Sequence, residues 1–155
     1  MLTDCPFCNR NVTSGAFAEE NSFIALYNHA PVVPGHSIII PVRHVTNMFD
    51  LSDKEYIGLF LFARKVTAFL NKYFLTDEFD LSLQQGLNAG QSVEHLHLHI
   101  IPRHANDLPD GEEWFHKLNK VKPNLLDSGR FLDNEEMTHM SGLLREEWKK
   151  FYSSR

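Results

Sequence analysis

Three histidines in one short segment are the residues of this sequence best suited to chemistry near neutral pH. His95, His97 and His99 alternate with Leu96 and Leu98, and two isoleucines and a proline follow them. Strict alternation of this kind is typical of a β-strand, in which successive side chains point to opposite faces of the sheet. We therefore expect the three imidazoles on one face of a strand and the leucines on the other.

The spacing of these histidines limits the chemistry that they can share. Same-face residues lie roughly 6.6 Å apart along a strand, so the ends of the run are about 13 Å apart. That is too far for three rings to share one ion with Zn–N bonds of about 2.1 Å, although two neighbouring rings could share a metal. Neutral imidazole is a competent nucleophile, and protonated imidazole stabilises anionic charge. The three histidines therefore indicate a site that binds and attacks phosphate groups. A strand face that is merely exposed to solvent would more usually carry lysine, glutamate or threonine.

A second candidate for chemistry is the pair formed by Cys5 and Cys8, the only cysteines of the chain. Their C-x-x-C spacing is typical of half a zinc site or of a thiol redox motif. A thioredoxin-like motif sits between a strand and a helix, whereas no strand-like run precedes this pair. A tetrahedral zinc site needs two further ligands. The position of the pair favours zinc, and a redox role remains the alternative.

Composition excludes several classes of protein. Fifteen Lys and Arg against 20 Asp and Glu give a net charge of -5, which provides no overall attraction to nucleic acid or to an anionic membrane. Two cysteines cannot build a disulfide framework, and we find neither a signal peptide nor a run of about 18 apolar residues. We expect a cytoplasmic protein that binds neither bulk nucleic acid nor a membrane.

The elements that must position these residues can be read from periodicity. Residues 23–28, 36–42, 80–85 and 95–103 are strand-like, and the loop between the first two contains two prolines and a glycine. Ser52 and Glu55 predict a capping box at the start of a helix over about 53–74. Its apolar residues recur at helical spacing and are expected to face the core: Tyr56, Phe60, Ala63, Val66, Leu70 and Tyr73.

Two further helices are expected beyond Pro102. Asp110 and Glu113 can cap a short one that carries Trp114, Phe115 and Leu118. Asp133 and Glu136 can cap a final one, with an apolar face of Met137, Met140, Leu144, Trp148 and Phe151. The order of strands, long helix, strands and helices favours an α+β domain on an antiparallel sheet over a repeating βαβ arrangement. The 155 residues are enough for one such domain.

The segment Gly90–Ile101, GQSVEHLHLHII, resembles the signature of the histidine triad (HIT) superfamily, His-x-His-x-His followed by two apolar residues. The resemblance extends upstream through Asn28 and the Pro-Val-Val-Pro-Gly-His loop that ends at His36, and it covers roughly residues 5–104. That loop and Gln84-Gln85-Gly86 are most similar to the fragile-histidine-triad branch, the dinucleoside polyphosphate hydrolases. The resemblance implies a single HIT-like domain over 1–155, with a core over 1–104 and a C-terminal helical extension over 105–155.

The implied architecture is an antiparallel sheet of about five strands with a long helix packed on it. The resemblance also implies a homodimer whose two sheets join edge to edge.

The resemblance further implies a role for each matching residue. His97 matches a nucleophile that attacks the α-phosphate and forms a nucleotidyl-histidine intermediate, which water then hydrolyses. His99 matches a histidine that contacts the phosphates, His95 one that supports the nucleophile or binds metal, and His36 one that orients the triad. Gln84, Gln91 and Ser92 match residues that contact the phosphates, and Asn28 matches one that contacts the ribose. Residues that contact the nucleobase match Phe7, Leu26 and Ile38. The last three could equally be plain core residues.

Many HIT proteins bind zinc through a cysteine pair and two histidines, which match Cys5, Cys8, His44 and His95. Members of the fragile-histidine-triad branch tend to lack the cysteines and the histidine that matches His44. The chain thus combines the loop of one branch with the metal ligands of another. The resemblance implies a structural Zn²⁺ that pins the N-terminus to the catalytic strand and holds His95, rather than one that activates water.

The expected function is hydrolysis of a small nucleotide, a dinucleoside polyphosphate such as diadenosine tri- or tetraphosphate. The alternatives are a nucleoside phosphoramidase, another nucleotidyl hydrolase or transferase of the same superfamily, and a nucleotide-binding sensor. Gln84 favours the dinucleoside polyphosphate hydrolase, because the phosphoramidase branch tends to have Asn at this position. Ser92 is compatible with a phosphoramidase. Arg43 and Arg103 could supply positive charge for a polyphosphate.

Overall fold

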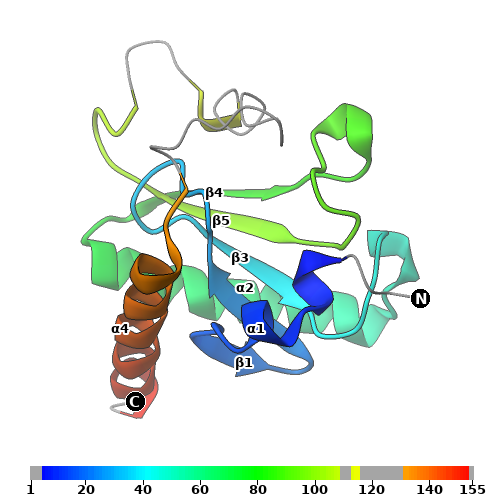
Figure 1. The fold of residues 1–155 in the computed structure, drawn as a ribbon, viewed down its shortest axis with the longest axis horizontal. Helices are drawn as coiled ribbons and strands as arrows, with labels where there is room; N and C mark the ends of the chain where they lie inside the picture. Colours follow the sequence, from blue (N-terminus) through cyan, green and yellow to red (C-terminus); the bar gives the residue numbers. More distant parts are fainter. Residues whose placement is uncertain (1–4, 109–112, 116–130, 154–155) are drawn as a thin grey trace.

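The computed structural model describes residues 5–108, 113–115 and 131–153 (Figure 1). A five-stranded antiparallel sheet with the order β1-β2-β3-β5-β4 forms its centre. This confirms the expected α+β class. The strands are β1 (Ala18–Glu20), β2 (Phe23–Tyr27), β3 (Ser37–Pro41), β4 (Glu78–Leu83) and β5 (Leu98–Arg103). The helices and 3-10 turns are η1 (Pro6–Cys8), α1 (Arg10–Thr13), η2 (Met48–Asp50), α2 (Asp53–Phe74), η3 (Leu87–Ala89) and α4 (Asn134–Ser153).

The sheet is covered on both faces. Along β2, Phe23, Ala25 and Tyr27 belong to one buried cluster, which includes the inner face of α2. Ile24 and Leu26 belong to a second cluster, against which Phe7 from the N-terminal segment packs. Figure 1 accordingly shows α2 behind the sheet and α1 in front of it. Since neighbouring residues of a strand point to opposite faces, every side chain of β2 is buried.

The long helix begins as predicted and buries Ala63, Val66 and Leu70 of the predicted core face, but not all of that face. Ser52 Oγ accepts from Glu55 N at 3.3 Å, and Glu55 Oε2 accepts from Ser52 N at 2.8 Å, which confirms the capping box. Tyr56 and Phe60 were expected in the core and are 41% and 39% exposed. The buried residues that were not predicted are Gly58, Leu59, Phe62, Thr67 and Phe69. The prediction was wrong at Tyr56 and Phe60 because α2 carries apolar residues on two faces, and periodicity alone does not say which meets the sheet.

The short first strand was missed, because Ala18–Glu20 has one buried residue and no apolar alternation. It joins β2 through Asn21 and Ser22, both at positive φ (51° and 67°), which is the backbone of a two-residue hairpin turn. The expected strand over 95–103 also starts later, since β5 begins at Leu98. His95 and His97 therefore precede the hydrogen-bonded ladder.

Helix α4 confirms the predicted C-terminal helix. Asp133 and Glu136 exchange hydrogen bonds of 2.9 and 2.8 Å at its start. Leu144 is fully buried, and the rest of the predicted apolar face packs against the same core as α2: Met137, Met140, Trp148 and Phe151. Of the short helix expected near Asp110, only Glu113, Trp114 and Phe115 lie within the described residues. Among the described residues, no helix combines the length and apolar character needed to cross a bilayer.

Candidate active site and metal site

His97 is held so that one ring nitrogen keeps a free lone pair. Its Nδ1 lies 2.8 Å from the carbonyl oxygen of His95. A carbonyl can only accept, so the proton of the neutral ring sits on Nδ1 and Nε2 carries the lone pair. The side chain is 4% exposed, and burial lowers the pKa of His97 below its ordinary value. His97 is therefore a neutral imidazole near pH 7 with Nε2 available as a nucleophile.

His99 is oriented by a second histidine from the loop before β3. Val32 N donates to His36 Nδ1 at 3.2 Å, so the proton of His36 sits on Nε2, which lies 2.9 Å from His99 Nδ1. Because His99 accepts this bond at Nδ1, its own proton sits on Nε2. Burial, followed by the neighbouring His36 and His97, holds the pKa of His99 well below its ordinary value. The amide Nδ2 of Asn28 lies 3.1 Å from His36 Nε2 but is itself a donor, so it does not compete with His99 for the His36 proton.

The register of the sheet explains which side chains accompany the triad. Leu26 is paired with Ile38, and Ile38 with His99, so these three residues form one row across the face opposite α2. Phe7 packs on the same cluster and meets the rings of His95 and His97 edge-on, with centroids 5.7 and 5.5 Å away. The apolar residues proposed for a nucleobase thus lie next to the histidines. Leu26 and Ile38 are each 5% exposed.

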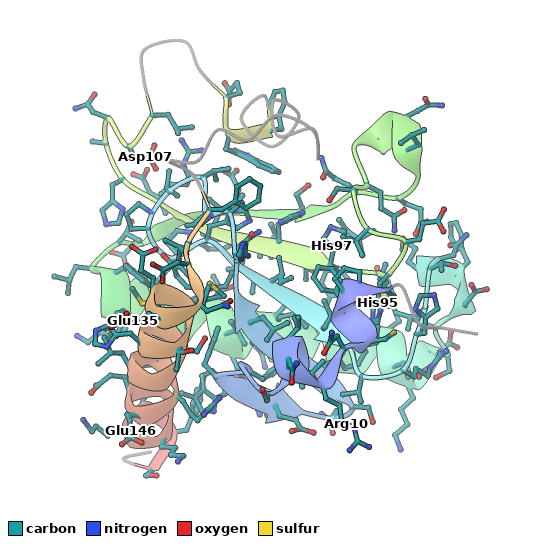
Figure 2. The ribbon with its side chains drawn as sticks, in the orientation of Figure 1. Arg10, His95, His97, Asp107, Glu135 and Glu146 are labelled. Carbon is teal, nitrogen blue, oxygen red and sulfur yellow. The ribbon has the colours of Figure 1, made fainter. Side chains whose placement is uncertain are left out.

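His95 faces the cysteine pair. Its Nε2 donates to Pro41 O at 2.9 Å, so the Nδ1 lone pair points to Cys5 Sγ at 3.4 Å and Cys8 Sγ at 3.7 Å. His44 Nδ1 completes the group at 3.3 Å from Cys8 Sγ, and all four atoms lie within 4.8 Å of one another. Figure 2 shows His95 beside the N-terminal turns and His97 next to it, on the opposite side of the view from α4.

These four residues fit a zinc ion. With Zn–S bonds of about 2.3 Å and Zn–N bonds of about 2.05 Å, the sulfur–nitrogen edge of a tetrahedral site is about 3.6 Å. The observed separations of 3.3 to 3.7 Å match that edge. Burial and the adjacent Cys5 raise the pKa of the Cys8 thiol. A dication would reverse that shift, because it stabilises both thiolates.

The loop between β4 and β5 carries the other matching residues. Gly86 N donates to Gln91 Oε1 at 2.7 Å, and Gln91 N donates to Gly86 O at 3.1 Å. Gly86 and Gly90 both adopt positive φ, near 90°, which allows this tight turn. Gln84 and Gln91 are half-buried and Ser92 is exposed. The Gln91 Nε2 atom is buried and has no hydrogen-bond partner among the described residues.

Neither arginine that the sequence offered for a polyphosphate has unpaired charge. Arg43 makes a bidentate pair with Glu55 at 2.8 and 3.0 Å and also donates to Asp50 O. Arg103 is held between Asp80 and Asp107, each at 2.8 Å. In both cases the partners are carboxylates of the fold, so these side chains secure loops and a strand end.

Trp114 is a residue whose place near the site was missed. It is 8% exposed, and its ring centroid lies 6.3 Å from that of His99. It packs on Val32 and Val33 of the loop that precedes His36. The sequence pattern that predicted a helix here did not predict the contact with His99, because that contact depends on tertiary structure.

Comparisons with known proteins agree with this geometry. The family model described as HIT domain matches residues 9–106. A bis(5'-adenosyl)-triphosphatase of Dictyostelium discoideum is 38% identical over 106 residues, which cover 68% of this chain and 70% of the relative. An asymmetrical bis(5'-nucleosyl)-tetraphosphatase of Schizosaccharomyces pombe is 36% identical over 114 residues, 74% of this chain but 63% of the relative.

Among solved structures, a Zn-bound histidine triad family protein from Mycobacterium smegmatis shares the fold, with a TM-score of 0.70 at 21% identity over 100% of both chains. The family match extends from the turn after the cysteine pair to the end of β5 and includes the whole histidine run. The chain therefore belongs to the HIT domain family.

Proposed function

We propose that the protein hydrolyses dinucleoside polyphosphates, such as diadenosine triphosphate or diadenosine tetraphosphate, at the α-phosphate. The observation that carries the proposal is the His97 ring, whose Nδ1 proton is bound by the His95 carbonyl so that Nε2 is free to attack. The names of the two relatives above, a triphosphatase and a tetraphosphatase of dinucleosides, support this substrate class. The number of phosphates in the preferred substrate is tested by the kinetic comparison described below.

The reaction proceeds in two displacements. His97 Nε2 attacks the α-phosphorus and forms an N–P bond, while the P–O bond to the remaining nucleoside phosphate breaks. That leaving group needs little protonation because it departs as a stabilised phosphate anion. Water then attacks the nucleotidyl-histidine, releases the nucleoside monophosphate and restores the imidazole. No general base is needed for the first step, because burial keeps His97 unprotonated.

His99 and His36 prepare the site for the charge on phosphorus. With its proton on Nε2, His99 can donate to a phosphate oxygen, and the bond from His36 keeps it in that tautomer. His36 acts through His99 and is a positioning residue. His95 takes a different part: it supplies the carbonyl that orients His97 and offers its ring to the metal site.

The remaining matched residues would bind the nucleotide. Gln84, Gln91 and Ser92 would contact phosphate oxygens, and Asn28 would contact the ribose. The buried, unpartnered Nε2 of Gln91 supports a role in binding an anionic acceptor. Leu26, Ile38 and Phe7, which share the face of His99, would contact the nucleobase.

Cys5, Cys8, His44 and His95 would hold one structural Zn²⁺. Such an ion neutralises the two thiolates and fixes the N-terminal turn, and with it Phe7, beside the triad. The four-ligand geometry and the Zn-bound relative of the same fold support this assignment. Elemental analysis of protein purified without chelator should give close to one zinc per chain. A content under about 0.2 would contradict the site.

We also propose a homodimer. Among the described residues, strand β4 pairs with β5 alone, and its Phe79 and Leu81 are 46% and 41% exposed. The outer face of α2 exposes a second set of large apolar residues, Tyr56, Ile57, Phe60 and Leu61. An unpaired edge and an apolar helix face are both features that a second copy can cover. Light scattering should give twice the chain mass for the wild type and a monomer for Ile57→Lys/Leu61→Lys.

The enzymatic proposal is tested by comparing kcat/KM for diadenosine triphosphate, diadenosine tetraphosphate and an adenosine phosphoramidate. We expect a dinucleoside polyphosphate to be preferred. Preference for the phosphoramidate would instead assign the site to a phosphoramidase. Single-turnover kinetics with fast chemistry and fast product release would exclude a sensor that holds its nucleotide. We further propose a cytoplasmic location, which imaging of the tagged chain would check.

A further inference from the structure

The two loops beside the candidate site are joined by Gln85, a side chain that the mechanism above does not use. Its Oε1 accepts from Met48 N at 3.1 Å, and its Nε2 donates to Thr46 O at 3.0 Å. A backbone N–H only donates and a carbonyl only accepts, so the two partners determine which end of the amide is oxygen. Gln85 therefore binds residues 46–48 with one donor and one acceptor, as a neighbouring strand would.

The same amide reaches Gln91. Gln85 Nε2 lies 3.5 Å from Gln91 Oε1, and Gly86 N donates to that oxygen at 2.7 Å. Both donors meet the oxygen end of the Gln91 amide, so its Nε2 end is turned away from them. That nitrogen is buried and has no hydrogen-bond partner among the described residues. A buried donor without an acceptor is unfavourable, which indicates that the acceptor arrives with a ligand.

The loop held by Gln85 is also attached to the triad. Val45 O accepts from Leu96 N at 2.6 Å, and Leu96 lies between His95 and His97. A chain of hydrogen bonds thus runs from the triad backbone through residues 45–48 and the Gln85 amide to Gln91. It joins the nucleophile's segment to the side chain that has an unused donor.

We propose that Gln85 is a positioning residue that holds the Gln91 amide so that its Nε2 is presented to a phosphate oxygen of the substrate. This inference rests on the proposed function, which supplies the anionic acceptor. Gln85 itself does not touch the substrate. Its side chain sets the direction of the Gln91 amide and keeps it in register with the segment that carries His97.

Gln85→Glu is the sharpest test, because it preserves the size of the side chain. One carboxylate oxygen still accepts from Met48 N, while the other replaces the donor and faces two acceptors, Thr46 O and Gln91 Oε1. We expect the affinity for adenosine monophosphate, measured by calorimetry, to fall about tenfold, the scale of one hydrogen bond to a charged group. The KM for diadenosine triphosphate should rise similarly, with kcat within about threefold, because a contact made equally in ground and transition states affects binding alone.

Asn88→Ala is the matched control, since Asn88 lies on η3 in the same loop and is exposed. It should change neither affinity nor KM. The decisive measurement is the double variant Gln85→Glu/Gln91→Ala. If Gln85 acts through Gln91, the double variant binds adenosine monophosphate within about twofold of Gln91→Ala alone. Defects that multiply overturn the inference.

A second variant, Gln85→Ala, removes both hydrogen bonds without adding charge and keeps the test decisive if Gln85→Glu does not fold. Wild-type affinity in both variants, or a fall in kcat with unchanged KM, overturns the inference. So does a loss of zinc that parallels the loss of affinity, because His44 lies on the loop that Gln85 holds. If the wild type binds adenosine monophosphate but hydrolyses no dinucleoside polyphosphate, the proposed function is wrong, and the affinities still decide the role of Gln85.

Discussion

The two faces of the central sheet differ in what holds their side chains in place. On the face covered by α2, Phe62, Val66 and Leu70 pack on apolar strand residues, and shape and volume are the main requirements. On the other face, His36, His97 and His99 are buried at 4% exposure or less, and each ring depends on a named partner. A buried polar group without its partner is costly, so a substitution on this face must keep a hydrogen-bonding group where it removes one. Packing against α2 therefore contributes stability, whereas the proposed chemistry lies on the opposite face of the sheet.

The largest effect should come from removing the nucleophile. His97→Asn keeps a polar side chain of similar breadth but has no ring nitrogen to attack phosphorus. We expect turnover of diadenosine triphosphate to fall by about 10³-fold or more, with the unfolding midpoint little changed. Steady-state assays and calorimetric binding of adenosine monophosphate will check this, with His104→Gln on an exposed histidine as the control. Full activity in His97→Asn would refute the nucleophile assignment.

The counterpart on the helix face is Phe62→Ala. Phe62 is fully buried and meets Trp148 of α4, with ring centroids 6.1 Å apart. We expect the free energy of unfolding in urea to fall by about 3–5 kcal/mol, because the substitution leaves a cavity. The kcat/KM of the protein that remains folded should stay within about twofold of wild type, since no partner of the triad is touched.

Phe49→Ala removes an aromatic ring that is 83% exposed and should leave stability unchanged. If Phe62→Ala lowered kcat/KM as well as the free energy of unfolding, stability and catalysis would not be divided between the two faces of the sheet.

The buried histidines should make stability depend on pH. The folded-state pKa of His99 lies well below the ordinary value of 6.5 and that of His97 is also lowered, in both cases chiefly through burial. Below about pH 6.5 the unfolded chain therefore binds more protons than the folded one. We expect the free energy of unfolding to be level above that pH. It should fall on acidification by up to about 1.4 kcal/mol per pH unit for each such histidine.

This slope will be measured by urea unfolding at pH values between about 5 and 8, the range in which histidine titrates. His99→Leu should reduce the slope by the share of one proton. A profile with no loss of stability on acidification would show that these rings can be protonated within the fold.

The smallest effect concerns the start of α2. Ser52→Ala removes the side chain that accepts from Glu55 N, and we expect a loss of about 1 kcal/mol in unfolding free energy. Ser52→Asp retains a capping oxygen and should restore most of it. If kcat/KM changed by more than about twofold in Ser52→Ala, the start of α2 would influence the histidine face of the sheet, and the two faces would not be independent.

Much of the fold followed from local pattern. The capping box at Ser52, the α4 cap at Asp133 and the strand runs over 23–28 and 36–42 were predicted because their signals lie within a few residues. Strand β1 was missed, since its pairing depends on the hairpin at Asn21 and Ser22 rather than on its own sequence. Tyr56 and Phe60 were misplaced because α2 has two apolar faces and only the sheet selects between them.

The candidate site divides in the same way. The histidine run and the C-x-x-C pair were readable as residue types and spacing, whereas His44 was indicated only by the resemblance to HIT proteins. The grouping of Cys5, Cys8, His44 and His95 within 4.8 Å, however, needs the N-terminus folded onto the segment before β5. Arg43 and Arg103 were equally plausible phosphate ligands by type, yet both are bound to carboxylates.

Residue types and their spacing set the chemistry that is possible here: alternating imidazoles, two thiols and an apolar framework at helix and strand spacing. How that chemistry is directed depends on contacts between segments that are distant in the chain. The His95 carbonyl sets the tautomer of His97, His36 sets that of His99, and Gln85 orients Gln91. The physical reason is that protonation state and amide orientation depend on partners brought from distant positions in the chain. No local pattern encodes those partners, whereas periodicity and capping act between near neighbours.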